Sequence, residues 1–133
     1  MTFAGINYLS VFLAAVAGFI TGAAWYTVLG RQWMAALSKS KDEMKPSPLP
    51  FVLSFVGELL MAFVLAGMIG HLGEVTLRNG IISGAFVWAG FILTTVVINN
   101  AYQGSRWALP VIDAGHWLAV LLVMGAVIGF MGV

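Results

Sequence analysis

Four uninterrupted apolar runs constrain the fold of this chain more than any other feature of its sequence. They cover residues 6–29, 51–72, 80–101 and 110–131, and each contains 22 to 24 residues. A helix rises about 1.5 Å per residue, so each run spans roughly 33 Å and can cross a hydrocarbon core of about 30 Å. Strands of a membrane barrel would show shorter segments of alternating polarity, which these runs lack. The runs therefore predict an all-α fold, a transmembrane four-helix bundle.

Charged residues are too few to cover a water-facing surface. Only 6 Lys and Arg and 5 Asp and Glu occur among 133 residues, and 61% of the residues are hydrophobic. Soluble domains contain about 25% charged residues. We therefore expect a single integral membrane domain over residues 1–133, with the lipid bilayer as its partner. A net charge of +1 offers no basic stripe for nucleic acid, and the absence of cysteine excludes thiolate metal sites and thiol redox chemistry.

The connections between the runs differ in charge. Arg31 and three lysines lie in the segment 30–50, and Arg106 lies in the third connection, whereas the second connection carries only Arg78. Basic connections are retained preferentially in the cytoplasm. This asymmetry predicts a multi-pass protein of the cell membrane, with the first and third connections inside and both termini outside.

The segment 30–50 is the only long connection. Trp33, Met34 and Leu37 share one helical face there, which is typical of a short helix lying in the headgroup region. We therefore expect a cytoplasmic interfacial segment, with a solvated linker as the alternative.

Glycines recur at a spacing of four in three of the runs. Lipid tails provide no hydrophobic drive for helix association, so close backbone approach at small residues must hold the helices together. This pattern predicts tight helix packing, and we expect one glycine face to join two copies in a homo-oligomer. The pairs are Gly18 and Gly22, Gly80 and Gly84, and Gly125 and Gly129.

Polar residues from different runs are expected at one depth in the membrane. Glu58 lies seven residues into the second run, and Asp113 and His116 lie three and six residues past Pro110, on one helical face. Each ionisable group inside a membrane costs about 2.5 to 3.5 kcal/mol on insertion scales, so it needs a partner, water or a function. We predict a hydrated, inward-opening pocket that binds a proton or a small polar solute. The ends of the first and third runs bring Trp25, Tyr26, Asn99 and Asn100 to the same layer.

Most of these residues also have a structural interpretation. Asp113 could stabilise the start of its helix and pair with Arg31 or Arg106. His116 could simply donate a hydrogen bond, the two asparagines could end a helix, and the two aromatic residues could be interfacial anchors. Glu58 is the hardest to explain in this way, because no basic residue occurs in any run.

Catalytic and metal-binding signals are weak. Glu58, Asp113 and His116 would suit a divalent ion, but only the last two have a supporting spacing, so we expect no metal. No serine elbow, phosphate-binding loop, dinucleotide fingerprint or zinc-protease helix occurs, so we expect no cofactor and disfavour an enzyme.

Two motifs carry a family resemblance. The stretch Gly22-Ala23-Ala24-Trp25-Tyr26, followed by Gly30-Arg31-Gln32-Trp33-Met34, resembles the opening of the DUF1761 family of small bacterial and fungal membrane proteins. The later Ile112-Asp113-Ala114-Gly115-His116-Trp117 is similar to the Asp-containing fourth helix of that family. The resemblance implies four transmembrane helices and brings no established activity.

Three hypotheses of function follow. The leading hypothesis is a small oligomeric transporter or channel-like protein that binds a proton or small polar solute in the polar layer. The alternative is a non-transporting scaffold or lipid-contacting accessory protein, in which the polar layer fixes the helix register. An enzyme acting on lipid headgroups, with Asp113 and His116 as acid and base, is third.

Overall fold

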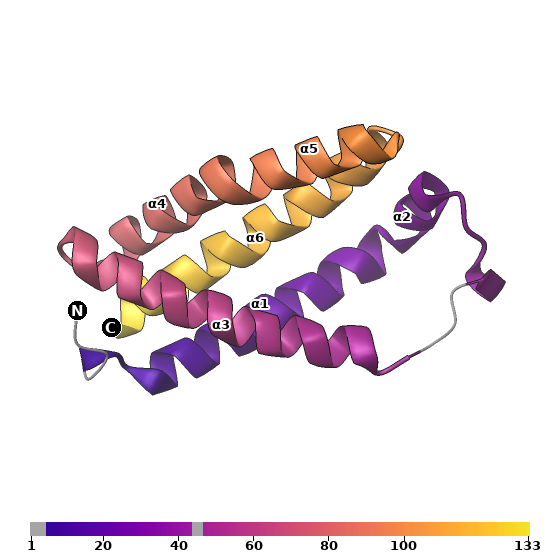
Figure 1. Ribbon diagram of the computed structural model, residues 1–133. Coiled ribbons are helices and arrows are strands. Elements are labelled where there is room, and N and C mark those ends of the chain that lie inside the picture. Colours follow the sequence, from indigo (N-terminus) through magenta and orange to yellow (C-terminus); the bar gives the residue numbers. More distant parts are fainter. Residues whose placement is uncertain (1–4, 44–46) are drawn as a thin grey trace.

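The computed structural model describes residues 5–43 and 47–133, and within those ranges the chain is made of helices and short connections (Figure 1). The predicted all-α fold is therefore confirmed. The elements in chain order are α1 (Tyr8–Val28), α2 (Gly30–Leu37), a 3-10 turn (Lys41–Glu43), α3 (Leu49–Leu72), α4 (Leu77–Val87), a π-helical turn (Trp88–Leu93), α5 (Thr94–Gln103) and α6 (Ala108–Met131).

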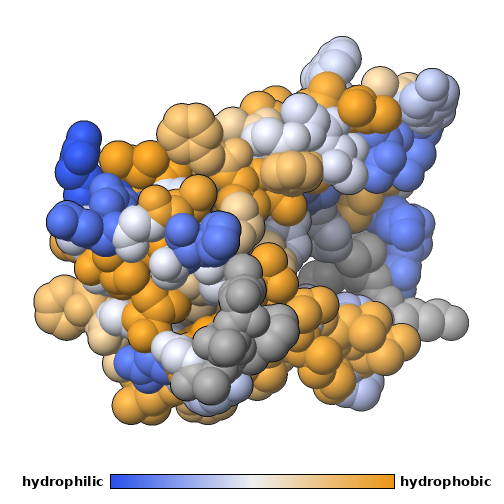
Figure 2. Space-filling model, turned by 60° about the vertical axis from the view of Figure 1, so that its left-hand side comes forward, coloured by the Kyte–Doolittle hydropathy of each residue, from blue (hydrophilic) through white to orange (hydrophobic). Residues whose placement is uncertain are grey.

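Four helices are long and apolar enough to cross a membrane. They are α1, α3, α6 and the continuous segment Leu77–Gln103, which joins α4 to α5 through the π-helical turn. Large apolar side chains cover their outer faces: Val28 and Phe86 are each 76% exposed and Phe130 is 80% exposed. Figure 2 shows apolar side chains over much of the visible face, with hydrophilic ones gathered toward its two sides. The chain is therefore an integral membrane protein whose outer faces suit lipid.

Helix α6 lies at the centre of the bundle. It packs against α1 on one side and α4 on the other, while α3 packs mainly against α1. Gly5 and Val133 border one cavity, so the two described ends of the chain meet at the same end of the bundle. We call the opposite end, which carries α2, Arg31 and Arg106, the basic end. Toward it α3 and α5 diverge (Figure 1).

Glycines bring α4 and α6 into backbone contact. A Cβ atom at Gly80 would overlap with the carbonyl oxygen of Gly125, and one at Gly84 would overlap with that of Leu121. Gly129 approaches the carbonyl group of Thr76 in the same way. The glycines of the last two spans thus pack within one chain, because only a hydrogen side chain allows this approach. These four glycines are therefore occupied by packing within the chain.

An apolar core fills the half of the bundle toward the chain ends. Its members come from the stretches of α3 and α6 that follow Glu58 and His116, together with the first half of α1. This half of the bundle therefore offers little polar surface between the helices. The fully or almost fully buried members are Ala14, Ala15, Ala62, Leu65, Ala66, Ile69, Val120, Leu121, Met124 and Ile128.

The π-helical turn changes which face of the third span meets its neighbours. Such a turn adds one residue to the helix, so the residues after it are rotated by about 100°. Two hydroxyl groups bond to backbone oxygens at this turn: Thr94 donates to the carbonyl oxygen of Gly90 at 2.9 Å, and Thr95 donates to that of Phe91. After the turn, Asn99 and Asn100 of α5 border a cavity near the basic end.

Candidate functional site

Two adjoining cavities lie between the helices toward the basic end. The first has a volume of about 340 Å³ and is bordered by α1, α3 and α6. The second, of about 610 Å³, extends to α2 and α5. The two are neighbours, since five residues border both: Tyr26, Phe51, Ser54, His116 and Trp117.

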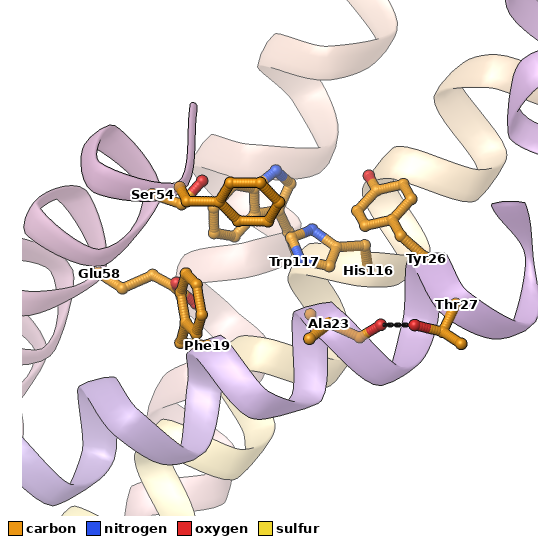
Figure 3. A pocket seen from close by; sticks show the side chains of 10 residues that line it. Phe19, Ala23, Tyr26, Thr27, Ser54, Glu58, His116 and Trp117 are labelled. Atoms are coloured by element: carbon orange, nitrogen blue, oxygen red, sulfur yellow. Dashed lines mark hydrogen bonds between the residues drawn. The ribbon is translucent and has the colours of Figure 1, made fainter. Parts of the chain in front are cut away.

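Glu58 reaches into the first cavity from α3. It is only 3% exposed, and its Oε1 atom has no hydrogen-bond partner among the described residues. The carboxyl group extends toward α1 and ends beside Phe19 (Figure 3). Its Oε1 atom lies 3.1 Å from the position that a Cβ atom on Gly18 would occupy. The lack of a side chain at Gly18 therefore makes room for this carboxyl group.

His116 borders both cavities from α6. It is 7% exposed, and its Nδ1 atom has no hydrogen-bond partner. Its ring centroid lies 4.8 Å from that of Tyr26 and 4.5 Å from that of Trp117. The Nε2 atom lies 2.7 Å from the position that a Cβ atom on Gly22 would occupy. Gly22, like Gly18 one turn earlier, thus leaves space for a polar side chain of another helix.

Asp113 is held by a tyrosine. The hydroxyl group of Tyr26 in α1 donates a hydrogen bond of 2.6 Å to Oδ1 of Asp113, which borders the second cavity. Arg31 and Arg106 are exposed, and neither forms an ion pair with Asp113 among the residues that the structure describes. The partner of Asp113 is therefore Tyr26 and not Arg31 or Arg106, as the sequence suggested. Helix α1 places the phenol of Tyr26 directly against this part of α6, whereas both arginine side chains are exposed.

The remaining predicted residues separate into two groups. Asn99 and Asn100 border the second cavity; the amide nitrogen of Asn100 donates to the carbonyl oxygen of Val96 at 2.8 Å, and its Oδ1 atom has no partner. Trp25 borders neither cavity. Its indole N–H group donates to the carbonyl oxygen of Ile112 at 3.1 Å, and its ring occupies the space beside Gly115. Trp25 thus joins α1 to α6.

Several residues of the cavity walls were not singled out from the sequence. Ser54 and Phe51 precede Glu58 by four and seven residues, so helical spacing places all three on one face of α3. The same spacing relates Phe19 to Tyr26 in α1. A search for neighbours at this spacing around each buried polar residue would therefore have found them.

The described residues of the site offer hydrogen-bonding groups but no cluster of metal-ligating side chains. Within residues 5–43 and 47–133, no three side chains of the His, Cys, Asp and Glu types come together. What converges is one unpaired carboxyl group, one unpaired imidazole nitrogen and one amide oxygen, surrounded by aromatic rings. Such a set can bind a proton or a small guest through hydrogen bonds and ring contacts.

Comparison with known proteins identifies a family and no described relative. No curated protein and no solved structure matches the chain significantly. A family model described as "Protein of unknown function (DUF1761)" matches residues 9–129, so the chain belongs to the DUF1761 family.

Proposed function

We propose that this membrane protein binds a proton or a small polar solute in the joined cavities, as a subunit of a small transporter or channel-like protein. The proposal rests on one observation: Glu58 and His116, from different helices, present unpartnered buried atoms to the same cavity. A buried polar group without a partner costs about 1–3 kcal/mol. A guest that supplies the missing hydrogen bonds accounts for both atoms.

Three half-buried polar groups between the helices do have partners, whereas Oγ of the buried Ser10 in α1 has none among the described residues. The indole N–H groups of Trp25 and Trp88 donate to backbone carbonyl oxygens of α6, and Tyr26 donates to Asp113. A Glu58 that served only to fix helix register would be expected to have a comparable partner. Its unpaired Oε1 atom therefore favours a role in binding.

The position of the cavities favours access from one side. They lie at the basic end, whereas the apolar core fills the bundle toward the chain ends. If the basic connections face the cytoplasm, a guest enters from the cytoplasm and reaches Glu58 before the core stops it. Complete passage then requires helix movement or a second copy, and a homo-oligomer would assemble through a face other than the α4–α6 glycines.

Cysteine labelling tests whether water reaches the first cavity. The chain contains no cysteine, so a single introduced thiol reports one position. Ala23 and its neighbour Ala24 are both exposed, but only Ala23 borders the first cavity. We expect a water-soluble thiol reagent to modify Ala23→Cys in vesicles much faster than Ala24→Cys. Equal, slow labelling of both variants would mean that the cavity is not open to water and would contradict the proposal.

Proton flux tests the role of Glu58. The protein is reconstituted in liposomes that contain a pH-sensitive dye, and a pH gradient is applied. We expect Glu58→Gln, which keeps the side-chain volume, to reduce the flux, and Glu74→Gln, a matched change at an exposed position, to leave it unchanged. Unchanged flux in Glu58→Gln, in a protein that conducts, would remove Glu58 from the mechanism.

A scaffold or lipid-contacting accessory role is the second candidate. Three hydrogen bonds between helices favour it, because they fix α6 against α1 and against the third span. Under this hypothesis Ala23→Cys stays unreactive, and Glu58→Gln changes only the stability of the protein.

A further inference from the structure

We propose that the guest of this site is a small organic cation of the ammonium type. This inference rests on the function proposed above and adds a ligand class to it. The observation behind it is that the buried carboxyl group of Glu58, which has no hydrogen-bond partner among the described residues, faces aromatic side chains across the first cavity (Figure 3).

The charge of the cavity walls favours a cation. Among the described residues that border the two cavities, Glu58 and Asp113 are acidic and none is Lys or Arg. Arg31 and Arg106 are exposed and border neither cavity. An anion would meet two carboxyl groups and no Lys or Arg side chain among the described wall residues, whereas a cation would neutralise the buried carboxylate of Glu58.

Two of the buried atoms without a partner at the site are acceptors. Oε1 of Glu58 and Oδ1 of Asn100 have no partner. Tyr26 donates to Asp113 and the amide nitrogen of Asn100 donates to a backbone carbonyl oxygen, whereas the hydroxyl group of Ser54 and the indole N–H group of Trp117, which border both cavities, donate to no described residue. Nδ1 of His116 can either donate or accept. The two buried acceptors suit a guest that carries N–H or polarised C–H groups.

The aromatic wall supplies the second element of ammonium recognition. Phe19, Tyr26, Phe51 and Trp117 border the first cavity. Phe19 is held by an edge-on contact with Phe55, with ring centroids 5.9 Å apart. Cations bind over aromatic faces within about 6 Å of the ring centroid, and quaternary ammonium groups are commonly recognised in this way.

Size and ligand number favour an organic cation over a metal ion. A cavity of about 340 Å³ is near the lower limit of ligand pockets, roughly 300–1,000 Å³, so it suits a small guest. A divalent ion bound by protein needs several oxygen or nitrogen ligands, and within the described ranges no three metal-ligating side chains converge. One carboxyl group beside aromatic faces is enough for an ammonium group.

Calorimetric titration with a charged and an uncharged probe tests the inference. The probes are choline and its carbon isostere 3,3-dimethylbutan-1-ol, which has the same shape without the charge. Each probe is added to the purified protein in a detergent that has no ammonium headgroup. We expect choline to bind at least about tenfold more tightly, and Glu58→Gln to abolish this difference. Glu74→Gln, at an exposed position, should preserve it. Equal affinity for the two probes would overturn the inference.

A second pair of variants tests the aromatic wall. Phe51 borders the cavities and is 66% exposed, whereas Phe130 is 80% exposed and borders neither cavity. Both sites tolerate leucine without loss of a core contact. We expect Phe51→Leu to weaken choline binding severalfold and Phe130→Leu to leave it unchanged; an equal effect of the two would argue against a cation–aromatic contact.

Labelling of Ala23→Cys shows whether the ammonium group belongs to a lipid or to a soluble molecule. It also separates failure of the cation inference from failure of the proposed function. Slow labelling in phosphatidylethanolamine vesicles, with fast labelling in phosphatidylglycerol vesicles, would identify a lipid headgroup as the cation. Fast labelling in both, slowed by choline, would identify a soluble cation. Fast labelling that neither lipid nor choline slows would overturn the cation inference but leave the proposed function standing, whereas slow labelling under every condition would overturn both.

Discussion

Gly84 packs directly against the backbone of α6, and we predict that a single methyl group at this position separates α4 from α6. A Cβ atom there would overlap with the carbonyl oxygen of Leu121 and lie 3.0 Å from its carbonyl carbon. Neither atom belongs to a flexible side chain, so rotation of a side chain cannot relieve the overlap. The helices themselves must move apart in Gly84→Ala.

The expected loss of stability follows from two opposing effects. Alanine favours a helix over glycine by about 0.8–1.0 kcal/mol in water. Overpacking costs about 1–3 kcal/mol, and a gap of about 0.5–1 Å forfeits a quarter to a half of the dispersion energy of each contact that it opens. Because the obstacle at Gly84 is rigid backbone, we take the upper end of this range. Gly84→Ala should then lower the free energy of unfolding by about 2 kcal/mol net.

Gly57→Ala is the matched control for this prediction. A Cβ atom at Gly57 in α3 would meet nothing within 4 Å. Its stability should therefore be unchanged or raised by up to about 1 kcal/mol. Both variants can be compared by reversible unfolding in mixed micelles with increasing sodium dodecyl sulfate, with helicity followed by circular dichroism. Equal stability of the two variants would mean that α4 and α6 are not in backbone contact, and the reasoning would be refuted.

Two further predictions concern the cavity walls. Gly22→Ala places a Cβ atom 2.7 Å from Nε2 of His116. Because the imidazole ring can rotate away, we expect the free energy of unfolding to fall by less than about 1 kcal/mol, while the NMR signals of the ring change clearly. Unchanged NMR signals would contradict the close approach of His116 to Gly22. Tyr26→Phe removes the hydrogen bond to Asp113 and should lower the free energy of unfolding by about 1–3 kcal/mol. The control Tyr102→Phe, at a side chain that is 91% exposed, should have no measurable effect. Equal effects of the two variants would show that the hydrogen bond does not contribute to stability.

The sequence by itself determines which segments form the bundle and how deep each polar residue lies. The length of an apolar run sets where a helix crosses the membrane, and the rise per residue then places Glu58 and His116 at similar depths. Both residues do border one cavity near the basic end. Depth along a helix is a local property, so it can be read without knowing the neighbouring helices.

Only the tertiary structure decides which way each helix faces. A helix that is apolar on all sides gives no signal of rotation about its axis, because every face is equally compatible with lipid. The sequence therefore could not show that Gly18 and Gly22 make room for polar side chains while Gly80 and Gly84 meet the backbone of α6.

The same limit explains the other differences. Trp25 donates to the backbone of α6 and borders neither cavity, and Asp113 pairs with Tyr26 instead of an arginine. The π-helical turn at Trp88–Leu93 rotates Asn99 relative to a regular helix, and no sequence spacing announces that turn. Rotation and neighbour choice depend on the packing of all four spans together, which a single apolar run does not encode.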